Sequence, residues 1–394
     1  MLAKLVPRFQ FDVSFADLCK ACTFLFNSKP FDSQSIVGLW KTKRAAFCSL
    51  SVRSAWDLAL TQWNFDSESE IIVSPITVKG MIEIIYDHGL VPVPVDLQLN
   101  FLVPSLEELE RALTPKTKAI LISYLYGSKP RIDAILDFAK KHNLLLIEDA
   151  AQAFDGLDYA GNPEADLSMF SFGPIKTCTA LGGAVSFCKS NLFARAVEER
   201  EKSWVQLDNL WFLKRVFKYG LLKFLSCKRV YGFFMSMLTL FTRNPDQVLK
   251  SLVRGFGSGS VLQGIRKRAP LVLMNFLKYR LQNYSQERLS RRRHLGRTLV
   301  QNLPSVLSIP GSKVEDHSFW IFPVIVKDAD RWIRILRDHG FDANGSGTNV
   351  GMVDGSRFAM PVAKLLSSSL LYLPLSPDLS DKDFKALLTF LKRT

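Results

Sequence analysis

The chain contains the stretch Ile147-Glu148-Asp149-Ala150-Ala151-Gln152-Ala153, which is followed by Phe170-Ser171-Phe172-Gly173-Pro174-Ile175-Lys176. The first stretch begins where a short apolar run, residues 144–147, ends. Such a run is typical of a buried strand. The strand therefore delivers Glu148 and Asp149 at its carboxyl end, which is where open α/β sheets place their ligands.

Short apolar runs alternate with helical patterns on both sides of this strand, from about residue 46 to 187. This alternation is typical of a βαβ sheet. The prolines in residues 91–95 indicate a strand at an edge or a strand start. We expect strands at residues 70–73, 91–95, 119–125 and 144–147, and helices at 78–89, 106–113 and 131–142. Residues 319–326, 328–340 and 381–392 predict a smaller C-terminal α+β unit.

The composition is that of a folded protein with an excess of positive charge. Hydrophobic residues make up 47% of the 394 residues and charged residues 22%, which excludes a disordered chain. The formal net charge of +14 favours an acidic partner. Asp12 and Asp17 interrupt any signal-peptide core, and no run is long enough to span a membrane. We expect a cytoplasmic protein, either soluble or peripheral on the inner face of a membrane.

The quoted motifs resemble those of the DegT-type (StrS-like) sugar aminotransferases, which are pyridoxal 5′-phosphate (PLP) enzymes of fold type I. The family patterns E-D-x-A-Q/H-A, F-S-F-x-x-x-K and G-G-A-V match residues 148–153, 170–176 and 182–185. Two further patterns match His317-Ser318-Phe319 and Pro374-Leu375-Ser376-Pro377. The likeness runs from about residue 40 to 203, and again from about 270 to the end.

This resemblance implies an α/β, aspartate aminotransferase-like fold with a large, mainly parallel sheet and a smaller C-terminal α+β domain. We assign residues 1–203 to the large PLP-binding domain and residues 266–394 to a linking helix and the small domain. The family also implies a homodimer with its sites at the subunit interface.

The chemistry of PLP explains why these residue types occur together. The cofactor withdraws electrons only while its pyridine nitrogen is protonated, which requires a buried carboxylate. It also needs a lysine amine, and its phosphate needs hydroxyl groups or a helix N-terminus. Asp149, Lys176 and Ser171 supply one group for each demand.

The resemblance assigns further roles to individual residues. Lys176 looks like the lysine that binds PLP and carries protons, and Asp149 looks like the partner of the pyridine nitrogen. Gln152 is expected to contact the 3′-oxygen, Ala151 one face of the ring, and Ser171 the phosphate. His317 and Tyr124 are expected to contact the substrate, and no metal is implied.

The chain departs from the family where the phosphate would bind. The family's S-G-T-A/S-A appears as Ser51-Val52-Arg53-Ser54-Ala55, so Val52 gives up the glycine's freedom to adopt positive φ. We expect Arg53 and Ser54 to hold the phosphate instead. Val78 stands where the family has an aromatic residue over the ring, and N-Y-R-M appears only as Arg266-Lys267-Arg268-Ala269. These departures indicate an acceptor other than an ordinary nucleotide-linked ketosugar.

Residues 204–265 interrupt the βαβ rhythm with leucines, aromatics and cations. Asp208 and Asp246 are the only acidic residues in this stretch. Cations beside such an apolar surface predict helices that lie on an anionic membrane. A buried dimer contact is the alternative, whereas nucleic acid is disfavoured because it needs less apolar surface. We expect deletion of residues 210–241 to leave the cofactor bound, and residues 291–293 to form a solvated helix face.

The first hypothesis is a PLP-dependent aminotransferase that moves an amino group from an amino acid, such as glutamate, to a keto-sugar or a membrane-presented keto acceptor. A second hypothesis is a non-catalytic, membrane-associated scaffold that retains the PLP fold. A third is another PLP reaction, such as that of a lyase or a dehydratase. The dehydratase branch of the family lacks the lysine, so Lys176 disfavours it.

Overall fold

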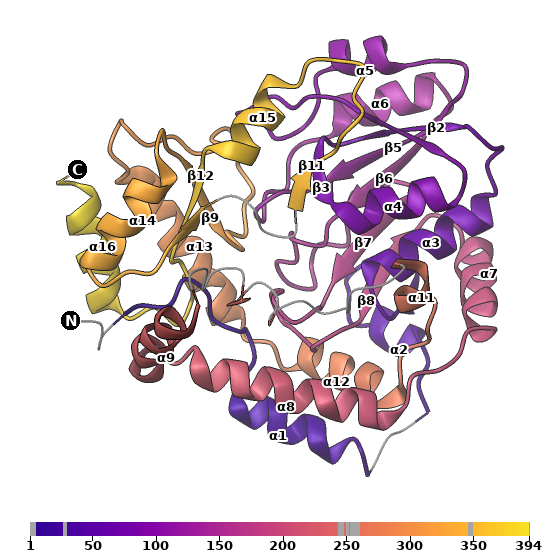
Figure 1. Ribbon diagram of the computed structural model, residues 1–394. Helices are drawn as coiled ribbons and strands as arrows, with labels where there is room; N and C mark the ends of the chain where they lie inside the picture. Colours follow the sequence, from indigo (N-terminus) through magenta and orange to yellow (C-terminus); the bar gives the residue numbers. More distant parts are fainter. Residues whose placement is uncertain are drawn as a thin grey trace.

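A computed structural model describes residues 5–26, 30–242, 248–249, 252, 261–345 and 350–393 of the chain. A large sheet with helices on both faces is joined to a smaller α+β unit that lies beside it (Figure 1). Helices α1, α8 and α12 lie side by side along the base of the large unit (Figure 1). The first described residues lie at the smaller unit, where Val6 pairs with Phe341, and the C-terminal helix lies there too (Figure 1).

The large sheet has seven strands in the order β1-β8-β7-β6-β5-β2-β4. All neighbouring pairs from β7 to β4 are parallel, whereas β8 is antiparallel to both β7 and β1. The strands are β1 (Ala45–Ser49), β2 (Glu70–Val73), β4 (Val91–Pro94), β5 (Thr117–Ser123), β6 (Leu145–Asp149), β7 (Leu167–Ser171) and β8 (Ala184–Cys188). The proline-containing strand β4 is an edge strand, as the sequence predicts.

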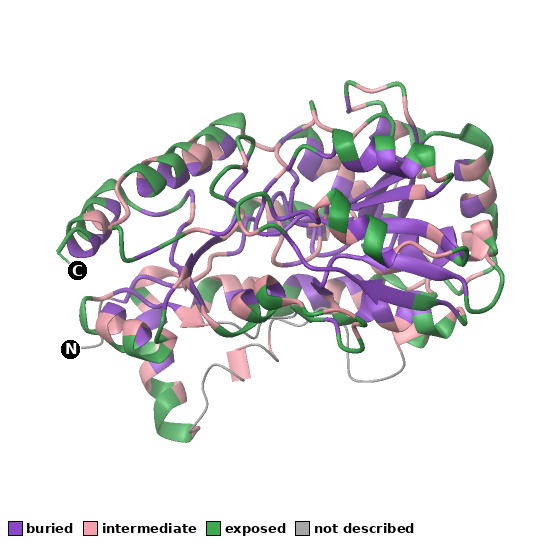
Figure 2. Cartoon of the chain, turned by 90° about the horizontal axis from the view of Figure 1, so that it is seen from above, coloured by how far each residue is buried: buried purple, intermediate pink, exposed green. Residues whose placement is uncertain are grey.

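Successive residues of each strand face opposite sides of the sheet and enter two separate apolar clusters. Phe47 and Leu121 pack on the side covered by α3, α4 and α7, whereas Cys48 and Ile122 pack on the other side. The strands are accordingly buried along almost their whole length (Figure 2). Because both faces are covered, ligands can reach the sheet only at the ends of its strands.

The helices of the large unit connect the strands and cover both faces. On one side lie α3 (Val52–Trp63), α4 (Lys79–Asp87) and α7 (Asn191–Lys202), with the short α11 (Val261–Ile265) against α4. On the other side lie α1 (Phe15–Thr23), α2 (Gln34–Val37), α5 (Leu106–Ala112), α6 (Asp133–Lys141), α8 (Asn209–Leu225) and α12 (Leu271–Gln282).

The smaller unit is built on a three-stranded sheet of order β10-β12-β9 and a core of its own. Its elements are β9 (Phe322–Ile325), β10 (Asn344–Gly345), β12 (Leu370–Leu373), α13 (Gln286–Gln301), α14 (Ala329–Asp338) and α16 (Asp381–Leu391). Helix α15 (Pro361–Ser368) and the two-stranded pair of β3 (Ile76–Val78) with β11 (Val350–Met352) join it to the large unit. The expected fold class, a large and mainly parallel sheet with a smaller α+β unit, is therefore confirmed, and the domain boundaries assigned from the sequence stay a prediction.

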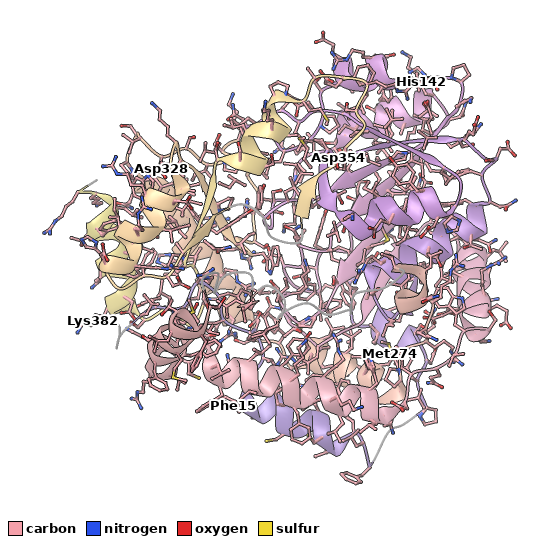
Figure 3. All side chains as sticks on the ribbon, in the orientation of Figure 1. Phe15, His142, Met274, Asp328, Asp354 and Lys382 are labelled. Atoms are coloured by element: carbon pink, nitrogen blue, oxygen red, sulfur yellow. The ribbon has the colours of Figure 1, made fainter. Side chains whose placement is uncertain are left out.

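The stretch predicted as a separate insertion is in part core. The inner face of α8, with Phe212, Val216, Tyr219 and Leu222, belongs to the same apolar cluster as the central sheet. Helix α9 (Lys228–Phe241) continues toward the small unit, where Tyr231 is buried. Helices α12 and α1 both contact α8. Met274 of α12 and Phe15 of α1 are labelled in Figure 3. Among the described residues, no helix is both long and apolar enough to cross a membrane.

Candidate active site

The carboxyl ends of neighbouring strands bring four polar residues to one face of the sheet. Ser123 pairs with Asp149 across β5 and β6, and Ala184 of β8 pairs with both Ser171 and Ser49. Strand alternation then places Ser49, Ser123, Asp149 and Ser171 on the face covered by α3, α4 and α7. Because β1 ends at Ser49, the N-terminus of α3 lies next to the end of β7.

Lys176 extends into this region from the loop after β7. A turn in which the Lys176 N–H donates to the Gly173 carbonyl, at 3.0 Å, holds its backbone. The Lys176 Nζ lies 4.1 Å from the centroid of the Trp320 ring. Burial lowers the pKa of Lys176 to about 8, and the nearby Asp149 opposes that shift. The amine is therefore partly uncharged near neutral pH.

Trp320 owes its position to a close approach between two loops. Gly127 has φ +97°, and a Cβ at this position would lie 2.6 Å from the Trp320 backbone nitrogen. The Ser318 N–H donates to the Gly127 carbonyl at 2.8 Å, and the Trp320 indole N–H donates to the Ile175 carbonyl at 2.9 Å. A side chain at residue 127 would thus displace the tryptophan from Lys176.

Asp149 is buried at the end of β6, where it accepts a hydrogen bond from the Ala151 N–H at 3.1 Å. Burial raises the pKa of Asp149, while this hydrogen bond and Lys176 act in the opposite direction. Gln152 accepts a hydrogen bond from the Tyr126 N–H at 2.8 Å, which fixes its side-chain oxygen. Asp149 and Gln152 are therefore each held by a backbone N–H, and Asp149 lies near Lys176.

The N-terminus of α3 has some of the groups that an anion site requires, namely backbone N–H groups and serine hydroxyls. The Ser51 hydroxyl caps the helix by accepting the Ser54 N–H at 3.2 Å, and Val52 begins the helix without a positive φ. The expected backbone penalty of replacing glycine by Val52 is therefore absent. The Ser54 hydroxyl donates to the Ile265 carbonyl at 2.9 Å, and this bond competes with its predicted contact to a phosphate.

Arg53 lies between α3 and α4. A Cβ at Gly80 would come within 2.9 Å of the Arg53 Cδ, so the side chain runs across the start of α4. Burial lowers the pKa of Arg53, and Glu83 opposes that shift. Its predicted contact with a phosphate stays a prediction.

The substrate contacts of Tyr124 and His317 stay predictions, and both side chains have other partners in the described chain. Tyr124 is buried on the opposite face of the sheet, where its hydroxyl donates to Glu148. His317 is buried too, and its Nδ1 accepts the Phe319 N–H at 2.8 Å. Burial lowers the pKa of His317 to about 3, so it stays neutral. It lines a different cavity, of about 170 Å³, with Arg297 of α13.

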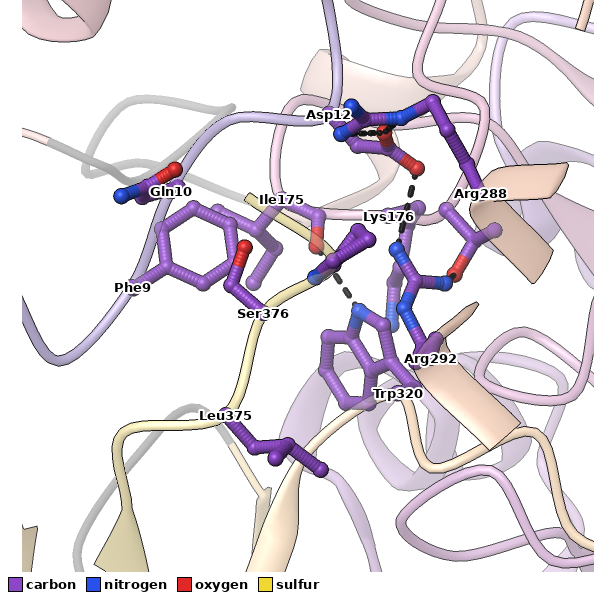
Figure 4. Close-up of a pocket in the computed structure, with 12 residues that line it drawn as sticks. Phe9, Gln10, Asp12, Ile175, Lys176, Arg288, Arg292, Trp320, Leu375 and Ser376 are labelled. Atoms are coloured by element: carbon purple, nitrogen blue, oxygen red, sulfur yellow. Dashed lines mark hydrogen bonds and ion pairs between the residues drawn. The ribbon is translucent and has the colours of Figure 1, made fainter. Parts of the chain in front are cut away.

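A small cavity of about 20 Å³ opens beside Lys176. Several residues that line it, among them Asp12, Arg288 and Arg292, lie outside the sequence motifs. Its walls come from the N-terminal segment, the Lys176 loop, α13 and the small unit (Figure 4). Arg288 and Arg292 of α13 reach Asp12 at 2.9 and 3.1 Å, and Arg292 also donates to the Thr177 hydroxyl at 2.6 Å.

The expected solvated face at residues 291–293 is therefore wrong, since Arg292 is buried and paired. The spacing of Arg288 and Arg292 by one helical turn is the sequence signal for this pair, but their partner Asp12 is remote in the chain. Trp320, which follows the His317 motif directly, is a further site residue that the motifs do not indicate.

The fold and this site define a class of proteins. An aminotransferase from Streptoalloteichus hindustanus matches 99% of this chain and 98% of its own, with a TM-score of 0.73 at 17% identity. A sugar aminotransferase from Micromonospora echinospora matches 99% of this chain and 100% of its own, with a TM-score of 0.71 at 16% identity. The fold is therefore the aspartate aminotransferase-like, type I fold.

Part of the chain is similar in sequence to one family of this class. Residues 41–217, which contain Asp149, Ser171 and Lys176, match the DegT/DnrJ/EryC1/StrS aminotransferase family. The matched segment is 177 residues long, which is less than half of the chain.

Curated relatives also match part of the chain. A GDP-perosamine synthase from Escherichia coli O157:H7 is 35% identical over 147 residues, which are 36% of this chain and 40% of the relative. A dTDP-3-amino-3,4,6-trideoxy-alpha-D-glucose transaminase from Streptomyces venezuelae is 36% identical over 155 residues, with 36% and 40% covered. The chain thus matches about two fifths of the length of these relatives.

Proposed function

We propose that the protein is a PLP-dependent aminotransferase that acts on a sugar. The observation that carries this proposal is the pair of Lys176 and Asp149, buried together at the carboxyl edge of the sheet. The names of the relatives and the type I fold support an amino-sugar product. Glutamate as the donor and a keto-sugar or a membrane-presented keto acceptor are part of the proposal, as is a homodimer.

The residues present fit PLP in the chemistry of their donor set. Asp149 is a buried carboxylate at a strand end, suited to a protonated pyridine nitrogen. The N–H groups at the start of α3, with Ser171 and Arg53, are suited to the phosphate. Gln152 and Ala151 lie beside Asp149 in the same turn. One feature fits less well, because Val78 offers no ring for stacking.

When bound, PLP supplies an electron sink for the carbon that gains or loses the amino group. Lys176 would act at its Nζ, which would hold the cofactor and would carry the proton that moves during transfer of the amino group. An amine with a pKa of about 8 does both near neutral pH, because it exists in both protonation states. Trp320 covers the amine and limits the access of water to it.

The test begins with the cofactor. Purified full-length protein incubated with PLP should develop a visible absorption band, and borohydride should then fix the cofactor to the peptide containing Lys176. The Lys176→Ala variant should lose both signals, whereas Lys140→Ala, a surface change on α6, should keep them. Label on another lysine would contradict the assignment of Lys176.

Activity is tested separately with glutamate as the donor and a series of keto-sugars as acceptors, by following the release of 2-oxoglutarate. Turnover by the native chain and none by Lys176→Ala would support an aminotransferase. A stable PLP complex without turnover on any such acceptor would favour the non-catalytic scaffold. Loss of the amino group without formation of an amino-sugar would favour a lyase.

A further inference from the structure

Helix α8 carries a second apolar face that nothing in the described chain covers. Leu210, Phe217, Leu221 and Phe224 are exposed by 53, 68, 60 and 51%. With Lys214 they are spaced alternately four and three residues apart, which places them along one side of the helix. Most soluble monomers expose such residues singly, so a continuous row indicates a surface that is covered in use.

Helix α9 continues this feature. Only Ser226 and Cys227 separate the two helices. Phe233, Leu240 and Phe241 are exposed by 68, 80 and 81%, and Met237 by 39%. These four residues follow the same helical spacing. Neighbouring helices therefore each present large apolar side chains to the outside.

The opposite face of α8 is held firmly by the body of the protein. Phe212 and Tyr219 are fully buried, the Arg215 guanidinium donates to the Leu181 carbonyl at 2.8 Å, and Lys223 donates to the Phe11 carbonyl at 2.8 Å. The helix cannot roll its outer row inward without breaking these contacts. The outward orientation of Phe217 and Leu221 is therefore a fixed property of the fold.

The charges around the row identify the kind of partner. Neither α8 nor α9 contains an acidic residue, whereas Lys214, Lys218 and Arg229 are exposed on them. Lysine and arginine side chains can place their stems among apolar groups and their charges among phosphates. A two-fold contact between copies of the chain would instead bring cations toward cations.

We propose that the exposed faces of α8 and α9 dock the protein on a lipid surface that contains anionic headgroups. The apolar side chains would enter the boundary between headgroups and acyl chains, and the exposed cations would contact lipid phosphates. Neither helix spans the bilayer, because both are too short and carry cations. This surface goes beyond the proposed reaction and shares no residue with the Lys176 site.

The experiment is vesicle sedimentation of the full-length protein. Vesicles of phosphatidylcholine with phosphatidylglycerol should bind the protein, and vesicles of phosphatidylcholine alone should bind it at least about tenfold more weakly. Salt should weaken binding as it screens the cations, leaving a remainder that resists salt because it depends on apolar burial.

Matched variants separate the two contributions. Phe217→Ser with Phe224→Ser should reduce binding by about tenfold or more at every salt concentration. Lys214→Gln with Lys218→Gln should flatten the salt dependence and leave the salt-resistant remainder. Leu192→Ser, on α7, removes an equally exposed residue (78%) away from the surface and should change nothing.

Two results would overturn the proposal. The first is that no binding to anionic vesicles occurs at low salt. The second is that the native chain is a dimer that Phe217→Ser with Phe224→Ser converts to monomers in the absence of lipid, as measured by sedimentation velocity. That outcome would make the surface a contact between copies of the chain. Neither result depends on cofactor binding or turnover.

Discussion

At the scale of single residues, burial acts on Lys176 and Asp149 in a way that favours the uncharged form of each. It lowers the pKa of Lys176 to about 8 and raises the pKa of Asp149. Each also stabilises the charge of the other, but burial is the larger effect on both. Perturbed groups of this kind are concentrated at catalytic sites, because a reactive amine must lose its proton readily.

The pH dependence of chemical modification at Lys176 should therefore reflect the lowered pKa of its amine. In cofactor-free protein, the rate at which an amine-specific reagent modifies Lys176 should rise with pH and reach half its maximum near 8. Because the carboxylate of Asp149 favours the charged amine, Asp149→Asn should shift this midpoint to lower pH. Peptide mass spectrometry measures the rate at Lys176, with exposed Lys140 as the reference. A midpoint for Lys176 equal to that of Lys140 would contradict the burial of the amine.

Sequence motifs located Asp149, Gln152, Ser171 and Lys176 because these residues are close together in the chain and lie at or just beyond two strand ends. The direction of Tyr124 follows from strand alternation and not from its motif. It lies one residue beyond Ser123, so its side chain faces the side of the sheet that Glu148 faces. For His317 no rule of this kind was available. Its direction depends on the packing of Phe319, with ring centroids 4.3 Å apart.

At the scale of elements, the N-terminal segment connects the two units through the site. Arg8 forms an ion pair with Asp342 of the small unit. Asp12 accepts hydrogen bonds from the Cys178 N–H at 3.0 Å and from arginines of α13. The segment thus bridges the small unit and the loop that carries Lys176. Arg288 and Arg292 hold the pKa of Asp12 well below its usual range, against the effect of burial.

Asp12→Asn should destabilise the protein by about 3–5 kcal/mol at pH 7, because buried Arg292 loses its charged partner. The folded-state pKa of Asp12 is lowered, so its stabilisation is complete above the ordinary value of about 4 and is lost as the pH falls below it. Urea unfolding at pH 7 and pH 3 should therefore show a smaller difference between native and variant at pH 3.

Asp381→Asn is the matched control for this change. Asp381 pairs with Arg291 on the same helix at 2.8 Å, but its side chain is 76% exposed. Exposed ion pairs contribute little to stability, so this variant should unfold like the native protein. If both substitutions changed the free energy of unfolding equally, the buried ion pairs of Asp12 would not contribute more to stability than an exposed ion pair.

Arg53 allows a prediction about the junction of α3 and α4. Arg53→Ala should weaken PLP retention by about tenfold or more, because a charge-assisted contact to a phosphate contributes about 1.5–3 kcal/mol. Equilibrium dialysis measures the effect, and Lys79→Ala on exposed Lys79, at the start of α4, is the control. If cofactor affinity is unchanged in Arg53→Ala, Arg53 serves only the packing of α3 on α4.

Element boundaries in the sheet region were predictable because hydrophobic periodicity there is strong. The strand expected at 70–73 is Glu70–Val73, and the helix expected at 106–113 is Leu106–Ala112. The link between Asp12 and α13 was not predictable, since its partners are more than 270 residues apart and share no local pattern.

At the scale of the whole molecule, one side of α8 packs in the core and the other side faces outward. Its composition resembles that of an interfacial helix because the buried and exposed sides both carry aromatics and leucines. Phe212 stacks edge-on against Phe276 of α12, and Tyr219 lies beside Phe11, while Phe217 points outward. Composition alone cannot distinguish these sides, which is why the sequence indicated a removable insertion.

Deletion of residues 210–241 should therefore prevent cooperative folding, contrary to the expectation from sequence. The deletion removes Phe212, Val216, Tyr219 and Leu222 from the core, and burial of each such side chain stabilises by about 1.5–3 kcal/mol. Their combined loss, about 6–12 kcal/mol, is comparable to the whole net stability of a typical protein.

Thermal unfolding followed by circular dichroism provides the measurement. The variant Phe217→Ser with Phe224→Ser should unfold at nearly the native temperature, because both side chains already face outward. The deletion should show no cooperative transition and should not retain PLP, since the Arg215 contact to the Leu181 carbonyl, behind the Lys176 loop, is lost as well. A soluble deletion variant with a native-like transition and bound cofactor would show that α8 is dispensable to the fold despite its buried face.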